Sequence, residues 1–310
     1  MSAFISTLNQ IAYLFGFILI GCILVKCKVV PADSAEVLSK LENNVFIPAL
    51  VMGTFMENFT VEKIGAAINL FSMSFVIGLV AILFAIIVSK LITKDQYIRK
   101  IYTYGLSFSN FGFMGNAVVS KLFPDIFLEY LIFTLPLWVF IYLWGVPRLL
   151  MAESGKKQTF KENVKNMLNP MFIAMIIGMI IGISGIKIPI WLGSLVSASG
   201  GCMSPIAMIL TGVVVSSISL KETFKNIRIY IVSIIRLLLM PLIFIWIAPL
   251  FNFSDALYVC AVCSLAMPLG LNTIVIPSAY GKDTTVAAGM AIISHMLSVI
   301  TIPFVFAIIS

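Results

Sequence analysis

The sequence is poor in charged residues. Only 11% of its 310 residues are charged and 61% are hydrophobic, whereas soluble globular proteins average about 25% and about 45–50%. The mean hydropathy is +1.10. A chain with so little polar surface cannot cover itself in water, so its outer surface must face lipid. The composition excludes a soluble enzyme, a nucleic-acid-binding protein and a disordered regulator.

Catalytic and metal-binding motifs are also missing. The chain has one histidine and lacks H-E-x-x-H, G-x-S-x-G and G-x-x-x-x-G-K-[ST], the motifs of metalloproteases, serine hydrolases and ATP-driven pumps. Its five cysteines follow no metal spacing and lie mostly inside apolar runs, where free buried thiols are expected. We therefore expect no enzyme activity, no catalytic residue, no metal and no bound cofactor.

What the sequence has instead is long apolar runs. A bilayer core of about 30 Å needs about 20 residues of helix, and runs that are apolar on all sides predict helices rather than a transmembrane β-barrel. No Lys or Arg precedes the first run, so we expect a retained helix there rather than a signal peptide. We predict an all-α polytopic membrane protein with ten transmembrane helices, numbered as spans 1 to 10: 4–25, 37–56, 66–91, 100–122, 126–150, 170–186, 188–217, 230–250, 255–280 and 284–309.

Basic residues are unevenly distributed between the two sides of these spans. The loops after spans 1, 3, 5, 7 and 9 hold sixteen of the 20 Lys and Arg residues, and the opposite loops hold only Lys63, Lys121 and Lys187. Because cytoplasmic loops carry an excess of basic residues, the odd-numbered loops are predicted to be cytoplasmic. Both termini are then extracytoplasmic, and we expect a multi-pass protein of the plasma membrane, here the bacterial inner membrane.

The two halves of the chain resemble one another. The segment PALVMGT from Pro48 in span 2 is echoed by PIAMILT from Pro205 in span 7, and Thr134-Leu135-Pro136 in span 5 is echoed by Thr301-Ile302-Pro303 in span 10. Five spans is an odd number, so the second copy enters the membrane from the opposite side. Such an inverted repeat is typical of transporters, whose binding site lies near the midplane. We predict a first repeat over 1–150, a cytoplasmic linker over 151–169 and a second, inverted repeat over 170–310.

Spans 4 and 9 contain glycine, proline and asparagine at mid-span. They read SFSNFGFMGN over 107–116 and AMPLGLNT over 266–273, the latter followed by Pro277. Such residues interrupt a helix, and an interruption inside a membrane is tolerated only where it is buried or lines a cavity. The N-termini of the half-helices at a break carry partial positive charge, which favours binding of a carboxylate. The alternative is that these residues are only glycines that allow close helix packing and a proline that kinks the helix. We predict a substrate site formed by Asn110, Gly112, Gly115, Asn116, Pro268, Gly270 and Asn272.

With these features the sequence resembles the auxin efflux carrier family, whose bacterial members include malate- and malonate-permease-like proteins. The resemblance covers nearly the whole chain. It is carried by 38–41 leading to 46–50, the 110–115 break, Asn169-Pro170, Ile188-Pro189, 204–212, 236–241 and 268–277. The resemblance implies a ten-helix carrier in which spans 4 and 9 cross as broken helices. It also implies a scaffold of spans 1, 2, 6 and 7, a mobile domain of spans 3–5 and 8–10 that moves in an elevator-like step, and small organic anions as substrates.

Arg236 and His295 lie well within predicted spans 8 and 10, and Glu42 lies in span 2 close to its cytoplasmic end. Ionisable residues are costly in a membrane and indicate function by default. Arg236 is either a counter-charge for a carboxylate or a clamp on backbone carbonyls. His295 either carries a coupling proton, since histidine titrates near neutral pH, or is a neutral histidine hydrogen-bonded between helices. We expect Glu42 to end near the interface or to pair with Lys40.

The leading prediction is a secondary active or facilitative transporter of small carboxylates that works by alternating access. Coupling to protons, to sodium or to neither stays open at this point, because backbone carbonyls alone hold sodium in some carriers. The alternatives are a sodium-coupled organic-anion symporter of the bile-acid type, and a membrane channel or sensor. The expected partners are the lipid bilayer and a small carboxylate, with a homodimer possible and no nucleic acid.

Overall fold

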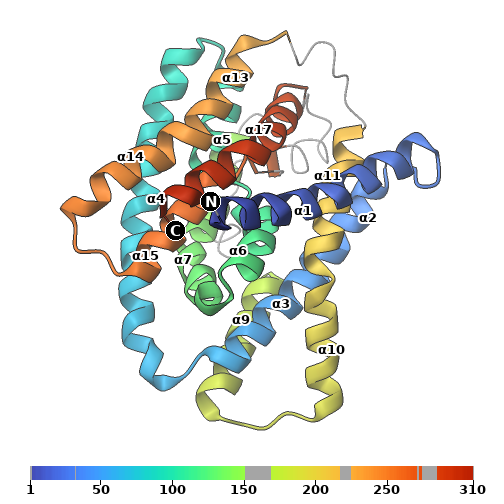
Figure 1. Cartoon of the computed structure of the whole chain (residues 1–310), viewed down its shortest axis with the longest axis vertical. Coiled ribbons are helices and arrows are strands. Elements are labelled where there is room, and N and C mark those ends of the chain that lie inside the picture. The colour runs from blue at the N-terminus through green and yellow to red at the C-terminus, as the bar shows by residue number, and fades with distance from the viewer. Residues whose placement is uncertain are drawn as a thin grey trace.

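The computed structural model describes residues 2–31, 33–150, 169–216, 225–270, 272–273 and 285–309. Every named element in these ranges is helical (Figure 1). The fold is all-α, as predicted, and the protein is a multi-pass membrane protein. The expected linker over 151–169 lies almost entirely outside the described residues.

The first half of the chain contains helices in each of its five predicted spans. Several are interrupted by short π- or 3-10-helical turns, which are designated η. The elements are α1 (Ser2–Lys26), α2 (Ser34–Leu41), η1 (Glu42–Phe46), α3 (Ile47–Asn58), η2 (Val61–Lys63), α4 (Ile64–Ile92), α5 (Gln96–Ser107), η3 (Phe111–Gly115), α6 (Asn116–Leu122), η4 (Pro124–Ile126), α7 (Phe127–Phe140) and η5 (Ile141–Leu150).

The second half also has helices in each of its predicted spans. They are α9 (Pro170–Ser184), α10 (Ile190–Gly201), α11 (Met203–Ser216), α13 (Ile227–Ile234), η6 (Ile235–Leu239), α14 (Met240–Ile247), η7 (Ala248–Leu250), α15 (Asp255–Ala266) and α17 (Thr285–Ile309). Within the described part of the chain, five helical stretches are long and apolar enough to cross a membrane: Val61–Ile92, Pro124–Leu150, Ile190–Ser216, Ile227–Leu250 and Thr285–Ile309. The total of ten crossings stays a prediction.

The helices form two groups. In the first, α1 packs along α11, and α3 packs along α9 and α10. In the second, α4 packs on α5 and α7, α13 packs on α17, and α15 packs on α7 and α14. Figure 1 shows α4, α13 and α14 on the left and α10 and α11 on the right. We call the first group, α1–α3 with α9–α11, the right-hand bundle. We call the second group, α4–α7 with α13–α15 and α17, the left-hand bundle.

Glycines bring the helices of the right-hand bundle into backbone contact. A Cβ atom added to Gly21 of α1 would collide with the carbonyl oxygen of Ile209 on α11, and one added to Gly178 of α9 would lie 2.7 Å from the carbonyl oxygen of Met52 on α3. Small residues allow such close packing of membrane helices. In both helix pairs, α1 with α11 and α3 with α9, the main chains are therefore in direct contact.

Candidate functional site

Span 4 is broken where its sequence predicted. Helix α5 begins after Asp95, whose side chain accepts a hydrogen bond from the Ile98 amide as an N-cap. It ends at Ser107, and the extended backbone of Phe108 leads to Asn110. The chain then turns through the π-helical η3 and continues as α6 from Asn116. Turns of this type occur often at functional sites.

Span 9 is broken in the same way. Helix α15 ends at Ala266, and Met267 is extended with φ −69° and ψ 148°. An extended backbone is expected before a proline, because the ring of Pro268 disfavours the helical conformation of its predecessor. Helical geometry returns at Asn272 and Thr273, and Leu271 and Pro277 lie outside the described residues.

The two breaks lie against each other. The amide of Asn110 donates a hydrogen bond of 2.7 Å to the carbonyl of Pro268, and Ser109 and Leu269 form an antiparallel bridge. The Leu269 amide donates to the Ser294 hydroxyl at 3.2 Å. Backbone groups freed from a helix in the membrane must find such partners. Spans 4 and 9 therefore cross as broken helices, as the family resemblance implies, and we call this contact the crossover.

A small cavity lies at the crossover. Its volume is about 10 Å³, which is about the space that one water molecule needs. Four of the seven predicted substrate-site residues line it: Asn110, Gly112, Gly270 and Asn272. The Asn110 side chain is 2% exposed, and its Oδ1 has no hydrogen-bond donor among the described residues. The cavity thus presents a free buried acceptor, in a space too small for an organic anion.

The other three predicted residues lie around this cavity rather than in its lining. Pro268 contributes the carbonyl that holds Asn110. Gly115 gives space to the hydroxyl of Tyr130, which itself donates to the Phe111 carbonyl at 3.1 Å. Asn116 is 4% exposed, and its Oδ1 also has no donor in the described part of the chain.

Several cavity residues escaped sequence analysis. They come from η3, α7, η5 and the segment before η3, and they are Ser109, Phe111, Phe113, Trp138 and Ile141. A Cβ added to Gly112 would lie 2.6 Å from the Trp138 ring, so this glycine makes room for the indole. A mid-span aromatic such as Trp138 carries no local signal, because apolar membrane spans are rich in such residues.

Arg236 holds the ends of both broken helices. Its guanidinium is 1% exposed. It donates to the carbonyl of Leu106 in the last turn of α5, at 2.8 Å, and to that of Ser264 in the last turn of α15, at 3.0 Å. A longer bond of 3.5 Å reaches the Met267 carbonyl. Carbonyls at helix C-termini lack intrahelical partners and carry partial negative charge. Of the two roles considered for Arg236, this geometry favours the clamp on backbone carbonyls.

His295 joins α17 to the crossover. Its Nδ1 lies 2.7 Å from the Ala291 carbonyl, and its Nε2 lies 3.1 Å from Nδ2 of Asn110. A carbonyl only accepts, so Nδ1 carries the proton and donates. Nε2 then accepts from the Asn110 amide. This arrangement is that of a neutral imidazole, whose ring fixes the orientation of Asn110.

A family of membrane transport proteins matches residues 6–306 of the sequence, which is nearly the whole chain. This is the family that the sequence resembles. The chain belongs to the auxin efflux carrier family. No curated protein matches it. The protein is thus a membrane transporter, from a family of transporters rather than enzymes. No group of three or more metal-ligating side chains occurs among the residues that the structure describes.

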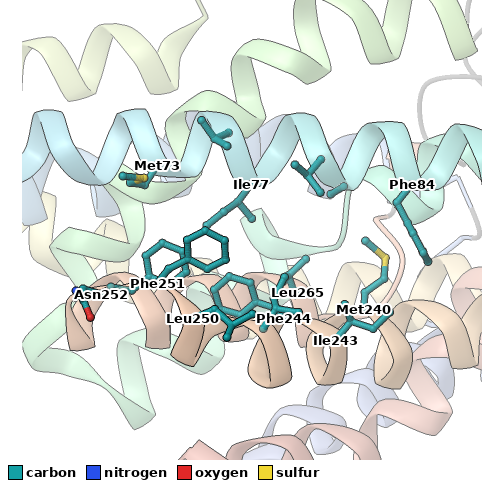
Figure 2. Close-up of a pocket in the computed structure, with 15 residues that line it drawn as sticks. Met73, Ile77, Phe84, Met240, Ile243, Phe244, Leu250, Phe251, Asn252 and Leu265 are labelled. Atoms are coloured by element: carbon teal, nitrogen blue, oxygen red, sulfur yellow. The ribbon is translucent and has the colours of Figure 1, made fainter.

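In this transporter, an apolar groove lies between α4 and α14. Its volume is about 660 Å³, and Figure 2 shows apolar side chains of α4, such as Ile77, opposite Phe244 and Phe251. Val76 and Val80 on its α4 wall are 54% and 58% exposed. Exposed apolar surface matches the lipid in which a membrane transporter lies. The groove lacks charged side chains, so it does not fit an anion site.

The position of Glu42 differs from the expectation that this residue ends near the interface or pairs with Lys40. Lys40 pairs with Glu36 at 2.7 Å instead, and Glu42 does not reach the interface, because it is completely buried. Neither of its carboxyl oxygens has a hydrogen-bond partner among the described residues. Glu42 lies in η1, which packs against α9, α10 and α11, and these three helices carry no charged residue. Sequence analysis could not predict this burial, because a residue near the start of a span can either reach water or turn inward.

Proposed function

We propose that this carrier moves small organic anions, specifically small carboxylates, by elevator-type alternating access. The substrate is held where spans 4 and 9 cross. Transport is secondary active or facilitative. The protein lies in the bacterial inner membrane with both termini extracytoplasmic, as the distribution of basic residues predicts.

The observation that carries this proposal is the crossover itself. Two interrupted helices meet, with the Asn110 amide hydrogen-bonded to Pro268 and the Asn110 Oδ1 left without a donor among the described residues. Discontinuous helices that meet at the midplane form substrate sites in secondary transporters. Neutral amides and backbone groups at such a break interact with a carboxylate without burying a second full charge.

The two bundles support the elevator mechanism. The right-hand bundle contains spans 1, 2, 6 and 7 and is joined by glycine-mediated backbone contacts, which suits a rigid scaffold. The left-hand bundle contains the crossover and its Arg236 clamp, which suits a domain that moves as one body. Span 1 packs on span 7 and span 2 on span 6, the exchange of partners that an inverted repeat produces.

The crossover also supports transport without sodium at this position. Main-chain carbonyls at helix C-termini coordinate sodium in some carriers. Here the carbonyls of Leu106 and Ser264 accept hydrogen bonds from the Arg236 guanidinium, so a resident positive charge occupies their negative ends. This favours a sodium-independent carrier over a bile-acid-type symporter. The crossover cavity of about 10 Å³ must widen before an organic anion enters, which suits alternating access better than an open channel.

Thermal unfolding of the purified protein tests this function. Ligands that bind the folded state raise the unfolding temperature by mass action. We expect one or more small mono- or dicarboxylates to raise it to the same extent in sodium chloride and in choline chloride. The increase should fall sharply in Asn110→Leu and Asn272→Leu, while the exposed-loop control Asn252→Leu keeps it. An undiminished increase in both crossover variants would contradict the site.

A further inference from the structure

A second, larger cavity lies between the two bundles. Its volume is about 300 Å³, within the range of small-molecule sites. The right-hand bundle supplies most of its wall, and α6, the half-helix that follows the crossover, supplies Ser120 and Lys121. Hydroxyl groups line it from several helices: Tyr13, Thr54, Ser120, Ser197 and Ser204. We call this space the vestibule.

The vestibule runs from one side of the membrane toward its middle. Along α3 its lining extends from Glu57, at the end of the helix, to Ala49. The eight residue steps from Ala49 to Glu57 correspond to about 12 Å of helix. The α3 end that carries Glu57 belongs to the side that is poor in basic residues, which we predict to be extracytoplasmic. This polar cavity lies between the proposed scaffold and the proposed mobile domain. A substrate that enters from this side would pass through it before reaching the crossover.

The vestibule contains one charge of each sign. Lys121 comes from α6 and Glu57 from α3. They form no ion pair with each other, and neither has another ion-pair partner among the described residues. Both side chains are exposed at the outer end of the cavity. The Lys121 ammonium group is therefore available to pair with an anion that enters the vestibule. A second negative charge on the same ligand would be repelled by the Glu57 carboxylate.

Asn116 connects the vestibule to the crossover. It lies four residues before Ser120 in α6, and residues with this spacing share a helix face. Ser120 lines the vestibule, and Asn116 lies on the same face of α6 one turn closer to the crossover, outside the vestibule lining. The Asn116 side chain is 4% exposed and its Oδ1 lacks a donor in the described ranges. In the vestibule itself, the lining hydroxyl groups suit hydrogen bonds to a hydroxyl group on a ligand.

We propose that the vestibule is an extracytoplasmic capture site for small hydroxylated monocarboxylates, in which Lys121 binds the carboxylate and Glu57 discriminates against dicarboxylates. The proposal rests on the function proposed above and specifies its substrate class. Opposite charges a few ångströms apart attract, and like charges repel, by amounts that correspond to about tenfold in affinity near a protein surface.

Uptake into proteoliposomes tests the proposal, with labelled lactate and malate as probes. We expect Lys121→Gln to raise the half-saturating concentration of lactate about tenfold. We expect Glu57→Gln to lower the half-saturating concentration of malate about tenfold. The half-saturating concentration of lactate should change little. The matched controls are Lys63→Gln and Glu62→Gln, which alter charges on the same side without lining the vestibule.

The outcomes separate this proposal from the function on which it rests. Saturable wild-type uptake of lactate or malate, with kinetics unchanged in both vestibule variants, would overturn the capture site and leave the carrier function intact. An unchanged malate-to-lactate ratio in Glu57→Gln would overturn its role in discrimination. If the wild type shows no saturable uptake of either acid, the capture site and the proposed substrate class both fail.

Discussion

The main chain of Asn110 is hydrogen-bonded to that of Pro268, at 2.7 Å between the amide nitrogen and the carbonyl oxygen. The bond joins the two interrupted spans without using either side chain. The carboxamide of Asn110 is oriented separately, by His295. Replacing that side chain therefore changes the chemistry of the crossover while leaving its main-chain connection in place, so function and folding can be tested separately.

Arg236 should be a major determinant of stability. Arg236→Met removes this donor from the Leu106 carbonyl, and an unpaired buried polar group costs about 1–3 kcal/mol. The Ser264 carbonyl loses one of two donors, because it also accepts from the Ser109 hydroxyl. We expect a large fall in the unfolding temperature in detergent, and a smaller fall for Arg236→Lys, which keeps the charge but loses the planar fork. Arg228→Met, at an exposed arginine, is the control. Equal stability of Arg236→Met and wild type would contradict the clamp.

The glycine contact between α1 and α11 gives a matched pair of variants in one helix. A Cβ at Gly21 would collide with the Ile209 carbonyl, whereas a Cβ at Gly16 would meet nothing within 4 Å. We expect Gly21→Ala to destabilise the protein by about 1–3 kcal/mol. Gly16→Ala should be neutral or stabilising, because alanine favours helix over glycine. Equal unfolding temperatures of the two variants would show that the bundle does not need this contact.

Glu42 should be dispensable for folding. Both carboxyl oxygens are buried without a partner in the described residues, and replacing an unpaired buried polar group with an apolar one of similar size is neutral or stabilising. We expect Glu42→Leu to raise the unfolding temperature or leave it unchanged. Glu36→Leu, which breaks the exposed pair with Lys40, should change the unfolding temperature little. Loss of transport in a stable Glu42→Leu protein would instead assign Glu42 a bound proton or cation.

His295 should not set the pH dependence of transport. Its Nδ1 donates to Ala291 and its Nε2 faces the amide donor of Asn110. A protonated ring would place its Nε2–H against the Nδ2 donor of Asn110, so this hydrogen-bond arrangement favours the neutral ring. We expect the pH profile of uptake by His295→Gln to keep the wild-type shape at a reduced rate, since Gln orients Asn110 less well. A flattened profile would identify His295 as the group that carries a coupling proton.

The helical class, the segments that form the spans and the positions of both breaks could be predicted from the sequence. These features depend on local composition: a run of apolar residues needs lipid, and Pro268 or the glycines of 112–115 disturb a helix wherever they occur. The contacts made by these segments depend on the tertiary fold. That Arg236 binds carbonyls, that Trp138 fills the space beside Gly112, and that Glu42 turns inward follow from helices brought together from distant parts of the chain.

Saturable exchange of a labelled small carboxylate across proteoliposomes is the most direct test of the crossover as the transport site. The comparison is between wild type, Asn110→Leu and the Asn252→Leu control, with equal incorporation and equal unfolding temperatures verified first. The account predicts saturable exchange by wild type and by Asn252→Leu, and little or none by Asn110→Leu. Equal exchange by all three proteins, or a flux that rises linearly with concentration, would contradict it.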